Sequence, residues 1–348
     1  MNSNPSIIIT AGPSLDDDAV LNNILSKNVS WIRFNMSHGD HDEHRTRQQK
    51  IQAAASLLNK KINYFVDLQG PKMRVRPVEN DAMELKSGDL VKVVSEPLLC
   101  TPGVVSIDVS EIHRYLTIGM TIFLHDGSME LKVTEVSEKD VTCVVIRGGI
   151  LEGHKGVNIP DALIPIDTIT DKDKADLSRA LSTMQVDGVA LSFVRSKDDV
   201  NELRRLLEEA GSSAVIISKI ETKLALKNIE PILNASDIVM YARGDLGVEI
   251  PAVEIPITQK ELCVIARTLE VPVIVATQML TSMKESPIPT RAEMTDAIDA
   301  LIDGATFLML SDETTLGKHP IEAVSTLNDA IFEFTSNQER YLPFETKS

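Results

Sequence analysis

Eight short runs of apolar residues, rich in Val, Ile and Leu, recur along the chain and have the character of β-strands. Most of these runs are nearly continuous, which is typical of parallel strands that are covered on both faces. Helical patterns alternate with them, and this alternation predicts an α/β fold whose strands close into a (β/α)8 TIM barrel. We place the strands at Ser6–Thr10, Ser30–Met36, Ile62–Leu68, Gly188–Phe193, Ala214–Ile220, Asp237–Ala242, Pro272–Thr277 and Thr306–Leu310.

Start and stop signals support the helices between these strands. Ser14 with Asp17, and Thr290 with Glu293, have the spacing of a capping box, in which a hydroxyl and an acid three residues later close the first helical turn. Gly304 stands where a helix is expected to end.

One connection breaks the alternation. Between the third and fourth strands, residues 71–156 have β character punctuated by turn signals. We interpret this segment as a small β-barrel lid domain, inserted after strand 3 on the catalytic rim. The barrel then comprises residues 1–70 and 157–348, with a polar tail from about Asn337. The strands expected in the insert are Met83–Leu85, Asp89–Val94, Thr121–Leu124, Met129–Val136 and Asp140–Arg147.

The composition, 43 % hydrophobic and 25 % charged, is that of a soluble globular protein with a sizeable core. No segment has the length of a membrane span and the first residues lack a signal pattern, so we expect a cytoplasmic protein without a membrane partner. Cys100, Cys143 and Cys263 are too far apart for a disulfide framework or a zinc site, and we expect buried thiols. The formal net charge of −16 argues against a nucleic-acid partner.

The strand bodies are almost wholly apolar, whereas the residues at their C-terminal ends are almost wholly polar. Barrel enzymes build their sites at these ends, so the asymmetry indicates an active site there. The strand-end residues are, in order, Thr10, Arg33, Asn35, Ser37, His38, Asp67, Ser192, Lys219, Glu221, Arg243, Gly244, Asp245, Thr277, Ser311 and Glu313.

Glu221 and Asp245 are the best candidates for metal ligands. Magnesium prefers oxygen ligands, commonly one or two carboxylates together with water and substrate phosphate. The alternative is a surface salt-bridge network, which is less expected for two acids beside a strand-end lysine. Lys219 could bridge a transferring phosphoryl group or stabilise an enolate oxygen, and could also pair with either acid in the resting site.

Other strand-end residues keep two interpretations each. The backbone amides after Gly244 could hold a carboxylate, although a short Arg-Gly-Asp triplet is usually an ordinary turn. Arg33 and Arg74 are guanidinium forks suited to phosphate, and each could equally be structural. His38 could touch a nucleotide or simply be a loop histidine. Thr277 could serve in a proton relay or cap a helix.

These residues also carry a resemblance that spans nearly the whole chain. The chain resembles the pyruvate kinases, whose motifs occur here in the family's order. The matching segments are 33–39, Asp67–Arg74, Lys155–Pro160, Ile217–Glu221, Ala242–Pro251, Ala276–Leu280, Pro289–Glu293 and Met309–Thr314.

The resemblance implies phosphoryl transfer from phosphoenolpyruvate to ADP, giving ATP and pyruvate in the last step of glycolysis. It implies that Arg33 and Lys219 hold the phosphoryl group, and that Glu221 and Asp245 bind Mg²⁺, or Mn²⁺ in its place. It further assigns the Gly244 and Asp245 amides and Thr277 to the substrate carboxylate, with Thr277 near the protonated carbon. The residues implied at the nucleotide and monovalent-ion side are Asn35, His38, Arg74 and Lys155, with Asp67, Ser37 and Glu313 in supporting positions.

A second expectation concerns potassium. Many pyruvate kinases need K⁺ and have Glu where this chain has Lys72. Leu68, Gln69, Lys72 and Val75 instead resemble the potassium-independent branch of the family. A tethered ammonium group can supply the charge of the bound ion, so we expect activity without K⁺.

The chain also departs from the family pattern. The resemblance leads us to expect that the usual C-terminal regulatory domain is absent, with no allosteric control through it and a homodimer through the barrel. Asp312 and Asp299 add negative charge where Gly and Asn are usual, and Ile288 replaces an Arg. If these side chains point inward, they should weaken binding of the anionic substrates.

Two other function classes compete with the kinase. One is a catalytically weak pyruvate kinase homologue that acts as a binding or regulatory protein, which Asp312 would favour. The other is a magnesium-dependent enolate lyase of the aldolase type. The nucleotide-side residues Arg74 and Lys155 disfavour the lyase, because a lyase has no ADP to cover.

Overall fold

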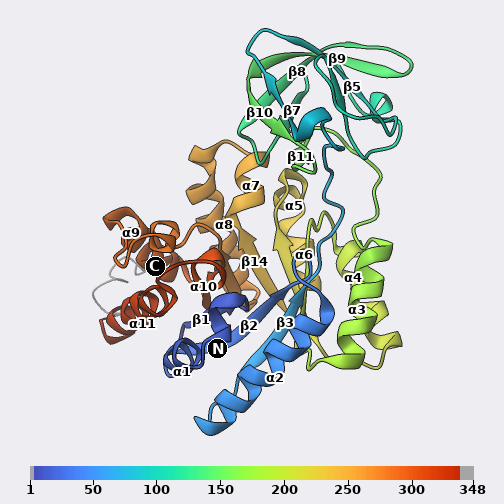
Figure 1. Ribbon diagram of the computed structural model, residues 1–348. Helices are drawn as coiled ribbons and strands as arrows, with labels where there is room; N and C mark the ends of the chain where they lie inside the picture. Colours follow the sequence, from blue (N-terminus) through green and yellow to red (C-terminus); the bar gives the residue numbers. More distant parts are fainter. Residues whose placement is uncertain (1–3, 338–348) are drawn as a thin grey trace, which may run out of the picture. The chain divides into compact units, whose positions relative to one another are not determined.

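Eight parallel strands form a closed barrel in the computed structural model, which describes residues 4–337 (Figure 1). The order around the barrel is β1-β16-β15-β14-β13-β12-β3-β2, and every neighbouring pair is parallel. The predicted α/β barrel is therefore confirmed. The strands are β1 (Ser6–Thr10), β2 (Val29–Asn35), β3 (Asn63–Asp67), β12 (Gly188–Leu191), β13 (Val215–Ile220), β14 (Ile238–Ala242), β15 (Val273–Ala276) and β16 (Phe307–Leu310).

Helices surround these strands, as Figure 1 shows. The α-helices are α1 (Asp18–Leu25), α2 (His41–Leu57), α3 (Asp171–Thr183), α4 (Lys197–Glu209), α5 (Lys223–Lys227), α6 (Ile229–Ala235), α7 (Arg243–Glu249), α8 (Ile255–Thr268), α9 (Arg291–Asp303), α10 (Asp312–Thr315) and α11 (Pro320–Ser336). Short 3-10 turns are η1 (Pro13–Asp16), η2 (Glu79–Asp81), η3 (Ile112–Arg114), η4 (Ala252–Glu254) and η5 (Thr281–Lys284). Within residues 4–337, no helix combines the length and the apolar character that a membrane crossing needs.

One predicted helix start is confirmed and one is wrong. Thr290 and Glu293 form a capping box at the start of α9, and Gly304 ends that helix with φ = 115°. Ser14 instead lies in η1 and donates its hydroxyl to the Thr315 carbonyl oxygen at 2.9 Å. The cap of α1 is Asp17, whose carboxylate accepts from two backbone amides. Helix α1 thus starts three residues later than predicted, because an acid at this position caps as well as a serine.

The barrel interior is filled by side chains from alternate strand positions. Ile8, Ile217 and Ile274 are at most 1 % exposed, and they pack with Phe65 and Met240 in one apolar cluster. This packed interior leaves the strand ends as the place where polar side chains can gather.

The chain divides into two compact units. The barrel unit comprises the residues up to Gly70, Thr168–Gly244 and the residues from Val253 on. The inserted unit comprises Pro71–Asp167 and Asp245–Ala252. The insert therefore extends past residue 156, because β11 (Val157–Asn158) pairs with β7 (Thr121–Leu124) of the insert, and it includes most of α7.

The inserted unit is all β apart from that helix and short turns, and its strands are divided between two sheets. A six-stranded sheet has the order β11-β7-β8-β9-β5-β6, and a two-stranded sheet pairs β10 with β4, so the predicted small barrel takes the form of two sheets. Both sheets enclose one apolar core. The remaining strands are β4 (Ala82–Leu85), β5 (Leu90–Val94), β6 (Val104–Ser106), β7 (Thr121–Leu124), β8 (Met129–Val136), β9 (Asp140–Arg147) and β10 (Gly149–Glu152).

The three cysteines are buried free thiols, as predicted. Burial raises the pKa of the Cys143 and Cys263 thiols to about 12, which keeps them protonated and unreactive near neutral pH. They therefore act as small apolar side chains in the core.

Candidate active site

Lys219 is the centre of a buried charged cluster at the C-terminal ends of the barrel strands. Its side chain is 10 % exposed, and its Nζ lies 2.9 Å from Glu221 Oε1 and 3.1 Å from Asp67 Oδ1. It also donates to the Ser192 hydroxyl at 2.8 Å. The predicted resting pair of Lys219 with Glu221 is confirmed. The ammonium group is thus fixed in place by three oxygens before any ligand arrives.

Asp67 links this lysine to Arg33. Arg33 Nε donates to Asp67 Oδ2 at 2.6 Å, while the other carboxylate oxygen faces Lys219. Burial opposes ionisation of Asp67, but the charges of Lys219 and Arg33 outweigh it and lower the pKa of this carboxyl group below its usual value. Asp67 therefore stays ionised and holds two cations side by side, an arrangement suited to a phosphoryl group.

The Glu221 carboxylate is 1 % exposed and fixed at both oxygens. Oε1 faces Lys219, and Oε2 accepts the backbone amide of Phe193 at 2.9 Å. A buried, oriented carboxylate beside a cationic pair matches the oxygen donors that magnesium prefers. The donor chemistry therefore fits the predicted metal.

Thr277 follows β15 in a strained backbone conformation. Its φ is 69°, which is rare for a β-branched residue and costs about 1–3 kcal/mol. The Thr277 hydroxyl accepts the Gly244 amide at 2.7 Å and donates to the Ala276 carbonyl oxygen at 2.6 Å. Thr277 does not cap the helical turn that follows it, since η5 starts four residues later with Leu280 at its N-cap, but its hydroxyl accepts an amide in the first turn of α7.

The Arg243 side chain binds the backbone of Thr277. Its Nε and Nη2 donate to the Thr277 carbonyl oxygen at 3.0 and 2.7 Å, and its Nη1 lies 2.7 Å from both carboxylate oxygens of Asp296. The sequence predicts Arg243 at a strand end but gives no role for it, and it gives no signal for Asp296. Two hydrogen bonds to the Thr277 carbonyl oxygen, from a guanidinium group that Asp296 holds by two more, can offset the strain at Thr277.

Gly244 is not sterically required in this arrangement. A Cβ atom there would lie 3.5 Å from the Thr277 hydroxyl oxygen, which is ordinary van der Waals contact. Its amide is already engaged by Thr277, so it can receive a substrate carboxylate only by sharing or exchanging that bond.

In the inserted unit, Lys72 lies between two acids. Its Nζ is 3.1 Å from Asp245 Oδ1 and 3.5 Å from Asp126 Oδ1. Burial works against the charged form, but these two carboxylates overcome it and raise the pKa of Lys72. The sequence does not predict Asp126 as a partner of Lys72, because Asp126 lies in a turn 54 residues further along the chain. Lys72 is therefore a fixed positive charge beside the proposed metal ligand Asp245.

Arg74 and Lys155, also in the inserted unit, have structural partners. Arg74 Nη1 donates to the His154 carbonyl oxygen at 2.9 Å, and Lys155 Nζ lies 2.9 Å from Glu152 Oε2. The side chain of Lys155 is 34 % exposed, so it can leave its partner for a phosphate at small cost.

Three of the predicted residues lie at the end of β2, which is Asn35, and in the loop after it, which carries Ser37 and His38. Asn35 accepts the Ser37 amide at 3.1 Å through its side-chain oxygen, and His38 is exposed. The buried ring of His44 lies against this loop, its Nε2 2.9 Å from the His38 carbonyl oxygen. Burial lowers the pKa of His44, so the ring stays neutral and donates to that carbonyl. His44 was missed, since a histidine inside a helical pattern carries no sequence signal.

Two neighbouring acids after β16 point in opposite directions. Glu313 is buried and accepts the backbone amides of Leu280 and Ser311 at 3.1 and 2.9 Å. The side chain of Asp312 is 63 % exposed and pairs with Lys284.

The other two departures from the family pattern also face solvent. Asp299 is exposed on α9, and Ile288 is 71 % exposed. Asp312 is exposed as well, so none of the three side chains points inward. The structure therefore gives no reason to expect that they weaken the binding of anionic substrates.

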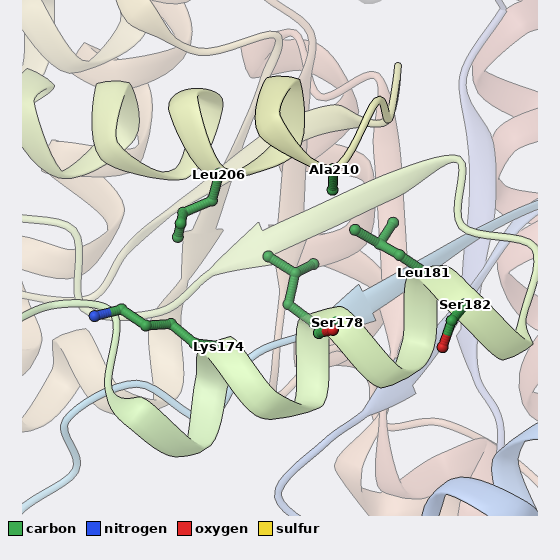
Figure 2. Close-up of a pocket in the computed structure, with 7 residues that line it drawn as sticks. Lys174, Ser178, Leu181, Ser182, Leu206 and Ala210 are labelled. Atoms are coloured by element: carbon green, nitrogen blue, oxygen red, sulfur yellow. The ribbon is translucent and has the colours of Figure 1, made fainter.

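A separate hollow of about 290 Å³ lies between α3 and α4 (Figure 2). Leu181 of α3 and Leu206 of α4 line it together with Lys174 and two serines. Its residues come from the outer helices, and none of the strand-end residues contributes to it.

Comparison with known proteins decides the family. A family model described as pyruvate kinase, barrel domain, matches residues 2–324. The chain belongs to the pyruvate kinase family. It is 44 % identical to pyruvate kinase 2 of Synechocystis sp. over 92 % of this chain and 55 % of that protein. It is 39 % identical to the pyruvate kinase of Thermotoga maritima, over 97 % of this chain and 72 % of that protein.

A solved structure agrees with the sequence matches. The crystal structure of a pyruvate kinase from Cryptosporidium parvum superposes with a TM-score of 0.92 at 35 % identity, covering 96 % of this chain and 70 % of that one. The chain spans between 55 % and 72 % of the length of the curated pyruvate kinases that it matches.

Proposed function

We propose that the chain transfers the phosphoryl group of phosphoenolpyruvate to ADP, giving pyruvate and ATP, as the last step of glycolysis. The observation that carries this proposal is the buried Arg33–Asp67–Lys219–Glu221 cluster at the strand ends of a pyruvate kinase family barrel. Burying charged side chains costs desolvation free energy, and such buried clusters are often found where fixed charges take part in catalysis.

The reaction divides into two events. The bond between phosphorus and the enol oxygen breaks while a β-phosphate oxygen of ADP bonds to phosphorus, and the enolate then takes a proton at its methylene carbon. Arg33 and Lys219 hold the phosphoryl oxygens in line, since two oriented cations match the charge that develops on them. Thr277 binds the carboxylate and lies near the carbon that is protonated. Arg74, Lys155, Asn35 and His38 bind the nucleotide.

We propose Glu221 and Asp245 as the carboxylate ligands of Mg²⁺, with Mn²⁺ as a substitute. When bound, the metal adds positive charge next to the phosphate oxygens. Within the described part of the chain, no group of three or more His, Cys, Asp and Glu side chains is arranged to hold a metal. The proposal therefore needs an ion that keeps water and substrate oxygens as ligands, as magnesium does.

The direct test follows pyruvate formation from phosphoenolpyruvate and ADP with Mg²⁺ present, and again with the metal chelated. We expect a turnover of about 1–1,000 per second with metal and loss of turnover without it. Turnover at background with substrate binding retained would instead favour the binding-protein alternative. Pyruvate release from an aldol substrate, with no use of ADP, would favour the lyase.

We also propose that Lys72 takes the place of a monovalent cation. Its ammonium group, held by Asp245 and Asp126, supports this because it supplies one fixed positive charge. We expect rates in sodium-only and potassium buffers to agree within about twofold, and Lys72→Glu to lose about tenfold or more in sodium and regain activity in potassium. A wild-type chain that needs added potassium would contradict the proposal. Lys86→Glu, at an exposed lysine of the same unit, is the control.

Finally, we propose a cytoplasmic enzyme that forms a homodimer through its barrel. The exposed apolar residues Val253, Ile257 and Val264, on or beside α8, support the dimer, since they are 76 %, 56 % and 59 % exposed.

A further inference from the structure

The inserted unit contains a hollow of about 610 Å³ that belongs to none of the residues discussed so far. It is lined by Arg76, by Ser95 and Glu96 just after β5, by five residues between Asp108 and Arg114, and by Glu138 and Lys139 in the turn between β8 and β9. Every side chain that lines it is polar or charged. A hollow of this kind binds through hydrogen bonds and ion pairs rather than through apolar burial.

Two of the lining side chains hold buried polar atoms without a partner. Arg76 Nε and His113 Nδ1 are inaccessible and make no hydrogen bond within the described residues. The Arg76 side chain also makes no ion pair in that part of the chain, unlike Arg114, which pairs with Glu111 at 2.7 Å. An unpartnered buried donor is destabilising, so the guanidinium group of Arg76 is incompletely satisfied in the free protein.

The charges around the hollow decide what kind of acceptor fits. Arg76, Arg114 and Lys139 face four carboxylates, those of Glu96, Asp108, Glu111 and Glu138. Counted over these seven side chains, the lining has four carboxylates and three cations, an excess of one negative charge, which would repel a ligand that is only an anion. A ligand of mixed charge can satisfy both sides.

We propose that this hollow binds a small amino carboxylate, a zwitterion whose carboxylate pairs with the Arg76 guanidinium and whose ammonium group faces Glu96. A planar guanidinium fork binds a carboxylate in a bidentate manner. Glu96 makes no ion pair within residues 4–337 and is exposed, so it is free to receive a cation. The site lies wholly within the inserted unit and needs nothing from the proposed reaction.

The test is calorimetric titration of the full chain with glycine, β-alanine, 4-aminobutyrate and 5-aminopentanoate, which differ only in the separation of their charges. Butyrate and butylamine are the single-charge controls. We expect saturable binding for at least one zwitterion at about millimolar concentration or below, with butyrate and butylamine at least about tenfold weaker. Equal binding of butyrate, or no binding by any of the series, overturns the proposal.

Variants locate the site. Arg76→Met keeps the length of the side chain and removes the guanidinium, and it should weaken binding about tenfold or more. Glu96→Gln should weaken binding of the zwitterion but leave the affinity for butyrate unchanged. Lys86→Gln, in the same unit but outside the hollow, should change neither. Because Arg76 Nε is unpaired, Arg76→Met should keep or raise the melting temperature of the free protein, and unchanged ligand affinity in that folded variant refutes the site.

Discussion

Replacing Lys219 by methionine is expected to lower kcat for pyruvate formation by about a thousandfold or more. The ammonium group is held by Asp67, Glu221 and Ser192 in a buried position, so methionine removes a positive charge that is fixed in place. The loss should fall on kcat more than on KM for ADP, since Lys219 is proposed to act on the transferring group. Steady-state rates from phosphoenolpyruvate and ADP provide the measurement.

The control for this variant is Lys197→Met, which removes an exposed lysine at the start of α4. It should retain the wild-type rate. Since Lys219→Met also leaves two buried carboxylates without their cation, its circular dichroism spectrum and melting temperature must be recorded beside the rates. A well-folded Lys219→Met chain with a rate within about tenfold of wild type would exclude the assigned role.

The second large effect concerns stability. Asp67→Asn should lower the free energy of unfolding by about 3–5 kcal/mol at pH 7, because it leaves Arg33 and Lys219 buried without the anion between them. Urea unfolding of wild type and variant measures the difference. Asp329→Asn, at an exposed position on α11, is the matched control and should change stability by about 0.5 kcal/mol or less.

We also expect the difference in the free energy of unfolding between wild type and Asp67→Asn to depend on pH. The pKa of Asp67 is lowered in the folded state, so its stabilisation is present above the unfolded value of about 3.9 and is lost as pH falls through the folded value. The gap between wild type and Asp67→Asn should therefore be widest near neutral pH and shrink below about pH 4. A gap that stays constant from pH 7 to the acid limit would show that Asp67 does not act through its charge.

Hydrophobic pattern alone predicted the barrel well, for a physical reason. Strands such as β1 and β16 are continuous apolar runs bounded by polar residues, and their ends fall within one or two residues of the predicted positions. The same rule missed β6, β10 and β11, which have two to four residues each and alternate too briefly to give a period. The rule also placed the end of the insert before β11, because the pairing of β11 with β7 is a long-range contact that has no local sequence signal.

The candidate site was predictable as a set of residues but not as a set of contacts. Strand-end position identified Lys219, Glu221 and Asp67, since parallel strands bring their carboxyl ends to one rim. The partners of Lys72 could not be predicted, because Asp126 and Asp245 are distant in the sequence and come near Lys72 only in the folded chain. Nor could the sequence distinguish outward Asp312 from inward Glu313, which differ by one position on a short helix.

Closure of the barrel has a consequence for how the chain is made. β1 pairs with β16 so that Ser6 stands beside Phe307, and the Thr10 amide and carbonyl both bond to Thr314. A ribosome adds about 5–20 residues per second, so the first strand waits about 15–60 s for its neighbour. During that time the edge of β1 that pairs with β16 stays unpaired. We therefore expect chaperones to bind the nascent chain until β16 has been synthesised.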